Sequence, residues 1–535
     1  MSGRRDDRSR RDARSDADGT RGGRGGSGRS GSGRGDDARG GSARNGSTRN
    51  GSTRNGSSRG GSARGGSAAP QRTVQPARRV AYDVLRAVSE SDAYANLVLP
   101  PTIADAGLTP QDAALATELA YGTLRRRGTY DAIISAAADR PAEEIDPAVL
   151  DALRLATHQL LATRVASHAA VNESVNLVAA HQGRGASSFA NAVLRRISRE
   201  TPGEWEQRIE ASARSDDERL ALRTAHPVWV IRALRRALAA EGRVDELDEL
   251  LDADNASPEV TLVALPGLAE PGEPRRPYAP TAYASAGGDP HRVIAASGGT
   301  VRVQDEGSQL VALALAGAAP IVPGERWLDL CAGPGGKTAL LAAIARQHDV
   351  RLEANEVVPT RARLVRNALR AVPGEVTVHE EDGRAFGATH PGAFDRILVD
   401  APCTGLGALR RRPEARWRKS PADVADLVPL QVELLCSALD AVAPGGIVAY
   451  VTCSPHLAET TGVVQEALRG RSDVTELDAR AVVADVADAP IDLADDGSSR
   501  VQLWPHRHGT DAMFLALLRR DTAAPRDIPP ADEGD

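Results

Sequence analysis

The sequence has few of the residues on which many folds and sites depend. Aromatic residues make up 3% of its 535 residues, and its four cysteines show no paired spacing of the secreted type. This usage excludes a disulfide scaffold and indicates free thiols in a reducing compartment. The chain also lacks an apolar segment suited to a signal peptide or a transmembrane helix, so we expect a cytoplasmic protein without a membrane partner. Its length predicts two or three domains.

Charge is unevenly distributed along the chain. The net charge is −6, yet the first seventy residues contain sixteen arginines and seven aspartates. Gly, Ser, Arg, Asp and Asn dominate there, so we expect a disordered tail over residues 1–72, and a shorter polar one over 521–535. A basic arm on an acidic body can tether a polyanion such as RNA. The alternative is a solubilising extension without a role.

Helical periodicity follows the N-terminal tail. Val80, Val84 and Leu85 share one helical face, and Asp146 directly before a proline is a good N-cap. We therefore expect an all-α bundle of five to seven helices, which forms a domain over residues 73–205.

The remaining sequence changes character twice. Proline and glycine are frequent within residues 206–300, so this stretch is interpreted as a connecting subdomain with a strand at 258–263. Strands and helices then alternate over residues 301–520, which predicts a doubly wound, mainly parallel sheet of the α/β Rossmann-like kind. The expected strands are 327–330, 351–354, 376–378, 397–399, 447–451 and 514–518.

The first of these strands runs into a glycine-rich turn and then a helix, in the stretch Cys331-Ala-Gly-Pro-Gly-Gly-Lys-Thr338. Such a turn is where α/β sheets hold nucleotide-like cofactors. A P-loop is disfavoured, because Cys331 stands where that motif needs glycine and Pro334 lacks a backbone N–H. The glycines also do not fit the dinucleotide pattern Gly-x-Gly-x-x-Gly. A third interpretation is S-adenosylmethionine, whose amino-acid part packs against a loop of this kind.

Acidic residues stand at the ends of the next strands. Glu356 follows the second strand, where a carboxylate can hold ribose hydroxyls, and Asp382 follows the third, where it can meet the adenine amino group. Each alone is consistent with a surface carboxylate, but their positions at successive strand ends favour a cofactor site. The candidate cofactor-binding residues are Cys331, Ala332, Gly333, Pro334, Gly335, Gly336, Lys337, Glu356, Asp382 and Asp400.

Two thiols complete the pattern. Cys403 ends the stretch Asp400-Ala-Pro-Cys403, Cys453 lies in Thr452-Cys-Ser, and each stretch directly follows an apolar strand. The ends of such strands border one crevice, so both thiols are candidate nucleophiles beside the cofactor. The other two cysteines are interpreted as core or loop-packing residues. The combination indicates transfer of a group to an electrophilic substrate.

With these motifs the chain resembles the RNA cytosine-5 methyltransferases, and within them the Fmu/Sun-type enzymes of small-subunit ribosomal RNA. The resemblance covers about residues 74–520. Three departures from the family pattern occur. Gly333 stands where a second alanine is expected, Asp511 opens Asp-Ala-Met-Phe in place of Asp-Gly-Phe-Phe, and the strand near residue 261 lacks Arg-x-Asn. The similar segments are 81–85, 121–125 and 168–175 for a NusB-like helical RNA-binding domain, and 303–309, 412–417 and 506–511 for the methyltransferase domain.

The resemblance implies S-adenosylmethionine-dependent methylation of C5 of a cytosine in 16S ribosomal RNA through a covalent cysteine–C6 adduct. Chemistry alone does not separate the two thiols. By resemblance, Cys453 is the nucleophile and Cys403 assists product release, while Asp400 is expected to hydrogen-bond the cytosine edge. The target base must be unpaired or flipped, which favours single-stranded or loop RNA as substrate. The expected partner is 16S ribosomal RNA in an unassembled or partly assembled small subunit. We expect a monomer and no metal ion.

An arginine-rich stretch follows the first thiol motif. Arg411, Arg412 and Arg416 lie within twenty residues of Asp400, with Trp417 among them, on an otherwise acidic body. This position predicts phosphate contacts with RNA, and the alternative is a solvated loop before a helix.

Three other functions compete with this one. A non-catalytic, NusB-like RNA-binding or antitermination protein would explain the helical half, but it would not need the two thiols and the glycine loop. An RNA cytosine-5 methyltransferase acting on tRNA shares the same chemistry. A methyltransferase for proteins or small molecules does not need a covalent thiol.

Overall fold

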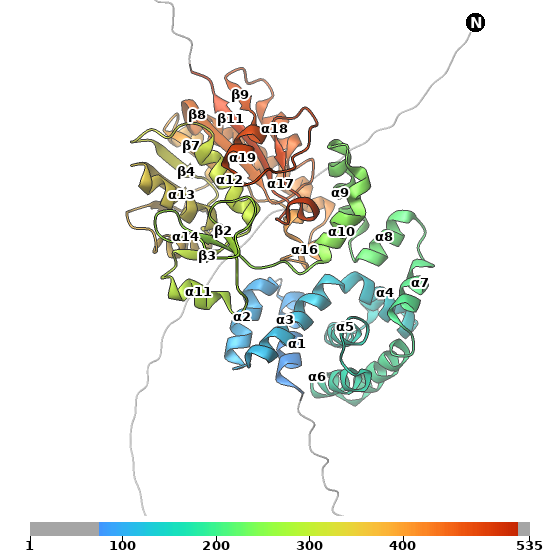
Figure 1. Cartoon of the computed structure of the whole chain (residues 1–535). Helices are drawn as coiled ribbons and strands as arrows, with labels where there is room; N and C mark the ends of the chain where they lie inside the picture. Colours follow the sequence, from blue (N-terminus) through green and yellow to red (C-terminus); the bar gives the residue numbers. More distant parts are fainter. Residues whose placement is uncertain (1–73, 92, 523–535) are drawn as a thin grey trace, which may run out of the picture. The chain divides into compact units, whose positions relative to one another are not determined.

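The computed structural model describes residues 74–91 and 93–522, which belong to one compact unit beginning at Pro70 (Figure 1). The predicted N-terminal tail lies outside the described residues, as does most of the predicted C-terminal one. Within the described ranges, no helix combines the length and apolar character that a membrane span requires. The described unit contains a helical region, a short connecting region and a mixed sheet covered by helices.

The helical region is a bundle arranged around α5. This helix packs against α1, α3, α4 and α6, and its residues are buried from Ala148 to Gln159 (Figure 1). Asp146 caps it by accepting bonds from the N–H groups of Ala148 and Val149, as the sequence predicts. The helices are α1 (Pro76–Glu90), α2 (Ala95–Asp105), α3 (Pro110–Arg125), α4 (Arg127–Ala138), α5 (Pro147–Ala162) and α6 (Ser167–Ile197), with the 3-10 turn η1 (Ala142–Glu144).

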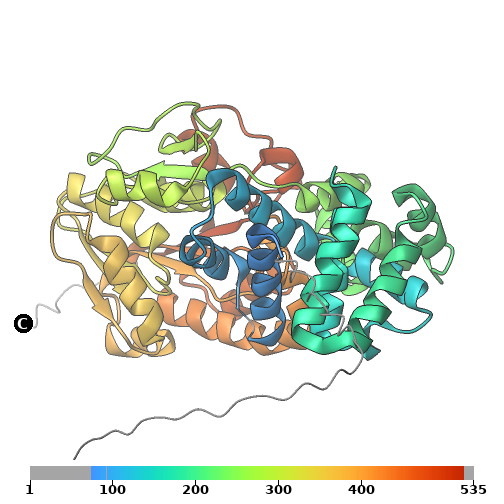
Figure 2. The same ribbon diagram turned by 90° about the horizontal axis from the view of Figure 1, so that it is seen from below.

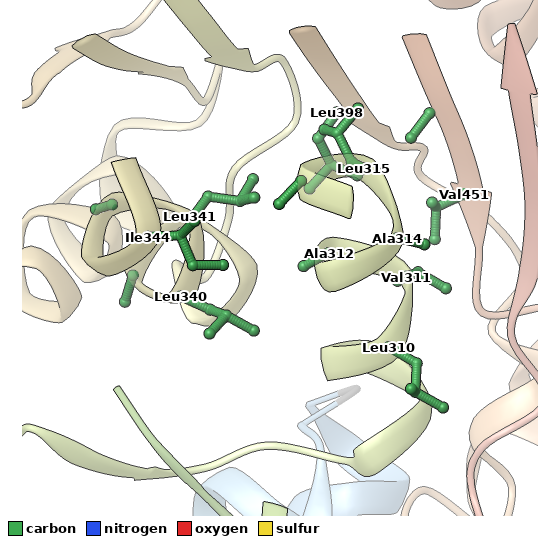
Figure 3. Packing of buried hydrophobic residues seen from close by; sticks show 14 of the residues in the cluster. Leu310, Val311, Ala312, Ala314, Leu315, Leu340, Leu341, Ile344, Leu398 and Val451 are labelled. Atoms are coloured by element: carbon green, nitrogen blue, oxygen red, sulfur yellow. The ribbon is translucent and has the colours of Figure 1, made fainter. Parts of the chain in front are cut away.

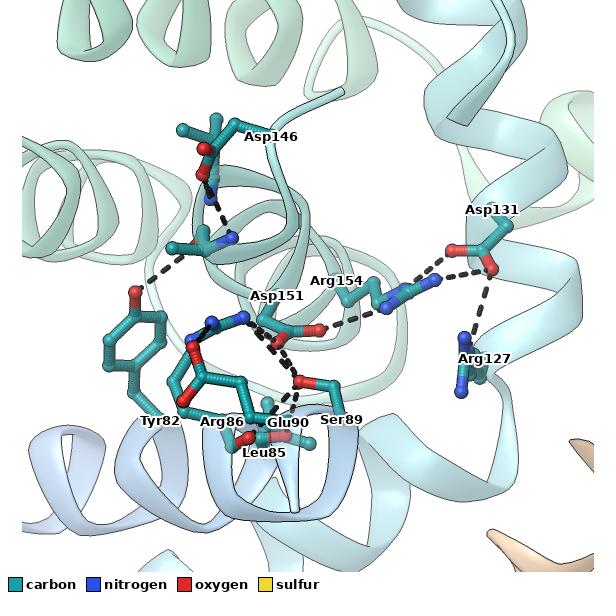
Figure 4. A network of polar contacts seen from close by, with 12 residues as sticks. Tyr82, Leu85, Arg86, Ser89, Glu90, Arg127, Asp131, Asp146, Asp151 and Arg154 are labelled. Carbon is teal, nitrogen blue, oxygen red and sulfur yellow. Dashed lines mark hydrogen bonds and ion pairs between the residues drawn. The ribbon is translucent and has the colours of Figure 1, made fainter. Parts of the chain in front are cut away.

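A buried ion-pair network links three of these helices (Figure 4). Asp151 of α5 accepts from Arg86 of α1 and from Arg154, both at 2.8 Å. Arg154 in turn donates two bonds to Asp131 of α4, which also lies 3.8 Å from Arg127. Because each buried charge has an opposite partner, the network stabilises one register of α1, α4 and α5.

The connecting region contains short helices and a small antiparallel sheet. Its strand order is β2-β1-β3, and β1 occupies the position where one strand was expected. Its elements are α7 (Pro202–Glu210), α8 (Asp216–Thr224), α9 (Val228–Ala240), η2 (Val244–Glu246), α10 (Leu247–Asn255), β1 (Thr261–Ala264), β2 (Ala282–Ala284), α11 (Pro290–Ala296) and β3 (Val301–Val303).

The main sheet has eight strands in the order β10-β11-β8-β7-β4-β5-β6, with β9 paired to β11. The strands from β4 to β8 are parallel, whereas β11 runs antiparallel to its three neighbours. The strands are β4 (Arg326–Asp329), β5 (Arg351–Asn355), β6 (Thr377–His379), β7 (Phe394–Asp400), β8 (Val442–Thr452), β9 (Val474–Leu477), β10 (Val501–Gln502) and β11 (Phe514–Arg520).

Helices cover both faces of this sheet, which confirms the doubly wound prediction. On one face α12 and α13 pack against strand residues such as Leu398 and Val451 (Figure 3). The other face packs against α15, α17 and α18 around Tyr450. The helices are α12 (Glu306–Gly317), α13 (Gly336–Gln347), α14 (Pro359–Leu369), η3 (Gly383–Ala385), α15 (Phe386–Thr389), η4 (Leu406–Ala408), α16 (Ala415–Arg418), α17 (Pro421–Ala441), α18 (Thr461–Leu468), α19 (Ala479–Val486) and α20 (Pro505–His508).

The topology determines where a ligand can bind. From β4 the chain continues outward to β5 and β6, and then returns to β7 and β8 on the other side. Parallel sheets bind ligands at the carboxyl ends of their strands, at such a reversal. Each of the six expected strands overlaps an observed one, so the predicted motifs at their ends lie at this edge.

Candidate active site

The glycine-rich turn joins β4 to α13. Gly335 has φ +104° and is the N-cap of α13, and a Cβ there would meet the backbone of Val365 at 2.9 Å. Glycine is therefore required both for the left-handed conformation and for the close approach of α14. No described side chain caps the N-terminus of α13, where backbone N–H groups favour a polar or anionic ligand group.

Glu356 lies against this turn. One carboxylate oxygen accepts the N–H of Gly333 at 3.1 Å, and the other accepts the N–H of Val358 at 3.0 Å. A Cβ on Gly333 would overlap this carboxylate. An alanine at this position would therefore require the Glu356 carboxylate to shift away from the loop. Both residues fit a cofactor whose ribose would lie beside the turn.

Asp382 lies further out. Its carboxylate is about half exposed and forms a bidentate pair with Arg384, at 3.0 Å to Nε and 2.6 Å to Nη2. The hydrogen bonds from Arg384 lower the pKa of Asp382. The structure therefore does not bring Asp382 into contact with the glycine turn, although it borders a shallow surface hollow lined also by Glu433 and Cys436.

Lys337 and Asp400 connect the cofactor turn to the thiol motifs. Lys337, in the first turn of α13, donates to Asp400 at the end of β7 over 2.7 Å. Burial alone would lower the pKa of Lys337, but the neighbouring Asp400 carboxylate raises it above its ordinary value. The contact with Lys337 holds Asp400 at the edge between the cofactor turn and the thiols.

The two predicted thiols lie together. Cys403 Sγ and Cys453 Sγ are 3.4 Å apart, although fifty residues separate them in sequence. They meet because β7 and β8 are parallel neighbours whose last paired residues are Asp400 and Val451. Neither thiol is fully buried. Two sulfur atoms at this distance can both reach one small substrate group.

The surroundings of the two thiols differ. The hydrogen bond with Cys403 lowers the pKa of Cys453 against the opposing effect of burial, and the charges of Arg412 and Lys337 add to the lowering. The same bond, burial and the nearby Glu459 raise the pKa of Cys403. Of the two sulfur atoms, Cys453 is therefore the one on which the thiolate form is favoured. The prediction that Cys453 is the nucleophile has the same direction.

The two remaining cysteines lie elsewhere. Burial is the largest cause that raises the pKa of Cys331 and of Cys436. Both pack against the apolar cluster around Tyr450, as expected of core or loop-packing residues. Neither has the environment of a reactive thiol.

The structure corrects the RNA-contact prediction for Arg416. Its side chain is fully buried and donates to the carbonyls of Ala225 and Asp254, each at 3.2 Å, and to Asn255 Oδ1 at 2.9 Å. It also lies 3.5 Å from the carbonyl of Arg125 in α3. A guanidinium enclosed in this way cannot contact a phosphate, so Arg416 joins the helical, connecting and sheet regions instead.

The neighbours of Arg416 belong to the same contact. Glu414 is buried and accepts the N–H of Ala95, at the start of α2, over 3.0 Å. The Trp417 ring fills the space where a side chain at Gly128 would lie. Arg418 donates to backbone carbonyls at the end of α1 and just beyond it. Residues 414–418 of the arginine-rich stretch therefore form a docking segment that contacts the helical region. The helical region lies beside the sheet region in Figures 1 and 2.

Arg411 and Arg412 precede this docking segment. Arg411 forms a bidentate pair with the buried Asp511, so its charge is already compensated, and the RNA contact predicted for it would require breaking this pair. Arg412 stacks on Tyr94 of the helical region, 5.4 Å from the ring centroid. The prediction of an RNA contact therefore holds better for Arg412 than for Arg411 and Arg416.

Sequence reasoning missed one residue of the site. Glu459 is fully buried beneath both thiol motifs and accepts hydrogen bonds from the residues that follow the two cysteines. In the sequence it stands just before α18, where an acidic residue is ordinarily explained by the helix dipole. No local signal distinguishes the two roles.

Comparisons with known proteins agree with this geometry. Residues 318–519 match the profile described as 16S rRNA methyltransferase RsmB/F, and residues 75–199 match that of the NusB family. A Mycobacterium tuberculosis protein named "Putative methyltransferase" is 50% identical over 464 residues, which cover 84% of this chain and 98% of that protein. The ribosomal RNA small subunit methyltransferase B of Salmonella enteritidis is 31% identical over 392 residues, or 70% and 86% of the two chains. The crystal structure of PH0851 shares the fold with a TM-score of 0.70 at 22% identity, covering 84% of this chain and 99% of that one.

Proposed function

The chain belongs to the RsmB/F family of S-adenosylmethionine-dependent RNA cytosine methyltransferases, and from this we propose that it methylates C5 of a cytosine in 16S ribosomal RNA. The observation that carries the proposal is the pair of thiols 3.4 Å apart beside the cofactor turn. The names of the relatives at about 30% identity support the small-subunit substrate.

The cofactor fits the turn after β4. The Glu356 carboxylate is held beside Gly333, and no described side chain caps the N-terminus of α13 next to it. When bound, S-adenosylmethionine supplies an electrophilic methyl group. We propose that Glu356 holds its ribose hydroxyls and Asp382 its adenine. The full proposed set is Cys331, Ala332, Gly333, Pro334, Gly335, Gly336, Lys337, Glu356, Asp382 and Asp400.

The protein's own groups prepare the cytosine. We propose that the Cys453 thiolate adds to C6, which forms an S–C bond and makes C5 nucleophilic enough to accept a methyl group. Lys337 holds Asp400 through a hydrogen bond. In the proposed reaction, Asp400 hydrogen-bonds the edge of the cytosine. Once C5 carries its new substituent, water takes up the C5 proton, the C5–C6 double bond forms again and the Cys453 sulfur leaves as a thiolate, with Cys403 assisting this elimination.

We also propose the limits of three domains, which are residues 73–205 for the helical domain, 206–300 for the connecting subdomain and 301–520 for the methyltransferase domain.

Bisulfite sequencing of RNA from a deletion strain tests the substrate. We expect one cytosine of 16S ribosomal RNA to lose its C5 methyl mark completely, and the intact gene to restore it. Because the same chemistry serves other RNAs, tRNA from the same strains is sequenced alongside. Loss of a tRNA mark with an unchanged 16S pattern would move the substrate to tRNA, and an unchanged pattern in both would contradict the proposal.

Replacing Cys403 with alanine tests the division of roles between the thiols. The Cys453 thiolate remains and can add to C6, whereas elimination is slowed, so a covalent protein–RNA adduct should accumulate. Denaturing gels with labelled RNA should show a shifted band that is absent from the unaltered protein and disappears on nuclease treatment. A Cys403→Ala protein that turns over normally would show that this thiol has no part in release.

A further inference from the structure

A buried carboxylate connects the two thiol motifs. One oxygen of Glu459 accepts the N–H of Thr404 at 2.8 Å and the side-chain amide of Gln431 at 3.2 Å. The other accepts the hydroxyls of Thr404 and of Ser454, the latter at 2.7 Å. Glu459 and Ser454 are fully buried, and Thr404 nearly so. Four donors therefore converge on a single carboxylate that is closed off from water.

The donors are placed so that they fix the sulfur atoms. Thr404 directly follows Cys403, and Ser454 directly follows Cys453. The ladder between β7 and β8 ends at the pair Asp400–Val451, before either thiol is reached. Beyond the ladder, the N–H of Ala401 donates to the carbonyl of Val451 and the N–H of Gly407 donates to the carbonyl of Cys453, both at 2.9 Å. The hydroxyls of Thr404 and Ser454 also lie 3.1 Å from each other, and the Glu459 carboxylate accepts from both, so it holds together the residues beside the two thiols.

A second layer holds the carboxylate itself. The buried Gln431 of α17 also donates to the carbonyl of Pro402 at 2.8 Å. The buried hydroxyl of Tyr450 donates to the backbone carbonyl of Glu459 at 2.8 Å. Side chains held on several sides keep a single rotamer, so the network can fix the positions of reacting groups within a fraction of an ångström.

We propose that Glu459 is the positioning residue that sets the spacing of Cys403 and Cys453. This inference rests on the proposed function, in which both thiols act on one cytosine ring. Glu459 touches neither the substrate nor the sulfur atoms, and acts through Thr404 and Ser454. Addition at C6 and the later elimination both need the thiols in register with the base, so both steps depend on this carboxylate.

Two conservative variants of Glu459 separate the effect of side-chain length from the effect of side-chain charge. Glu459→Gln keeps the length of the side chain, and its amide can face the two hydroxyls, which rotate to accept. Glu459→Asp keeps the charge but is shorter by one methylene and cannot span both loops. If Glu459 acts by positioning, kcat should fall less than about tenfold in Glu459→Gln and about 100-fold in Glu459→Asp, with the KM for S-adenosylmethionine unchanged in both.

A direct probe of the spacing does not depend on methyl transfer. Phenylarsine oxide bonds two neighbouring thiols through its arsenic atom, with loss of one water, and requires both at close range. The unaltered protein should bind one equivalent and Cys403→Ser none at this site. Glu459→Gln should bind as the unaltered protein does, and Glu459→Asp at least tenfold more weakly. Cys403→Ser/Cys453→Ser gives the background from the other two cysteines.

Glu306→Ala is the matched control. Glu306 is an equally buried carboxylate that accepts the N–H groups of Tyr278 and Ala279 and has no described contact with Thr404 or Ser454. The Glu306→Ala substitution should lower the melting temperature of the protein without changing its binding of phenylarsine oxide. Wild-type kcat and arsenical binding in Glu459→Asp, or an inactive Glu459→Gln beside an active Glu459→Asp, would overturn the proposal. If the unaltered protein proved inactive on 16S ribosomal RNA, the arsenical series would still decide the role of Glu459.

Discussion

Replacing Cys453 with alanine is expected to abolish methyl transfer, with a loss on the order of 10⁴-fold or more. Cytosine C5 does not react with a sulfonium methyl group unless a nucleophile has added at C6, and Cys453 is the thiol whose pKa is lowered. The variant removes the Cys453 partner, but burial and the nearby Glu459 still raise the pKa of Cys403, so Cys403 is a poor replacement for the missing nucleophile. Incorporation of labelled methyl groups into unmodified 16S ribosomal RNA measures the loss.

Binding measurements show whether this loss is chemical. Calorimetry should give the same affinity for S-adenosylmethionine in Cys453→Ala as in the unaltered protein, because the turn after β4 is intact. Cys436→Ala is the control for removing a thiol, since Cys436 packs against apolar side chains away from the pair, and it should retain activity. An active Cys453→Ala protein would contradict the assignment of Cys453 as the nucleophile. An inactive Cys403→Ala without adduct, beside an active Cys453→Ala, would reverse the assignment.

Replacing Arg416 with alanine is expected to destabilise the protein by about 3–5 kcal/mol. The change leaves three carbonyl and amide oxygens without a donor, and leaves Asp254 buried without its cation. Burial already raises the pKa of Asp254 to about 7, and Arg416 opposes this rise. Denaturant unfolding monitored by tryptophan fluorescence measures the change, because Trp417 lies in the same segment.

Arg412→Ala provides the comparison. Its side chain is half-buried on Tyr94, so its loss should cost less than about 1 kcal/mol, whereas a contact with RNA phosphate should reduce the salt dependence of RNA binding by about one unit of slope. The folded fraction of the Arg416→Ala protein should bind RNA with the same salt dependence as the unaltered protein. A stable Arg416→Ala with a weaker salt dependence would return this arginine to the RNA path.

The parts of the site that sequence could predict are those with a local signature. The turn from Cys331 to Lys337 and the two thiol motifs each follow a strand, and parallel strands bring their ends to one edge regardless of what lies between them. Arg416 and Glu459 could not be assigned in this way. The acceptors of Arg416 come from residues 125, 225, 254 and 255, and Glu459 meets a threonine fifty-five residues earlier. Such roles depend on tertiary packing, which a charged residue in an isolated segment does not indicate.

The stretch from Cys403 to Arg418 has a consequence for how such proteins can be recombined. Its first residue is half of the thiol pair, and its last residues bond to the backbone of α1 and the chain just before α2. A helical region taken from another species would present a different surface to Trp417 and a different backbone to Arg418. A working chimera must therefore transfer this short stretch together with the helices. The unit of exchange is discontinuous in the gene, although each domain is continuous in the chain.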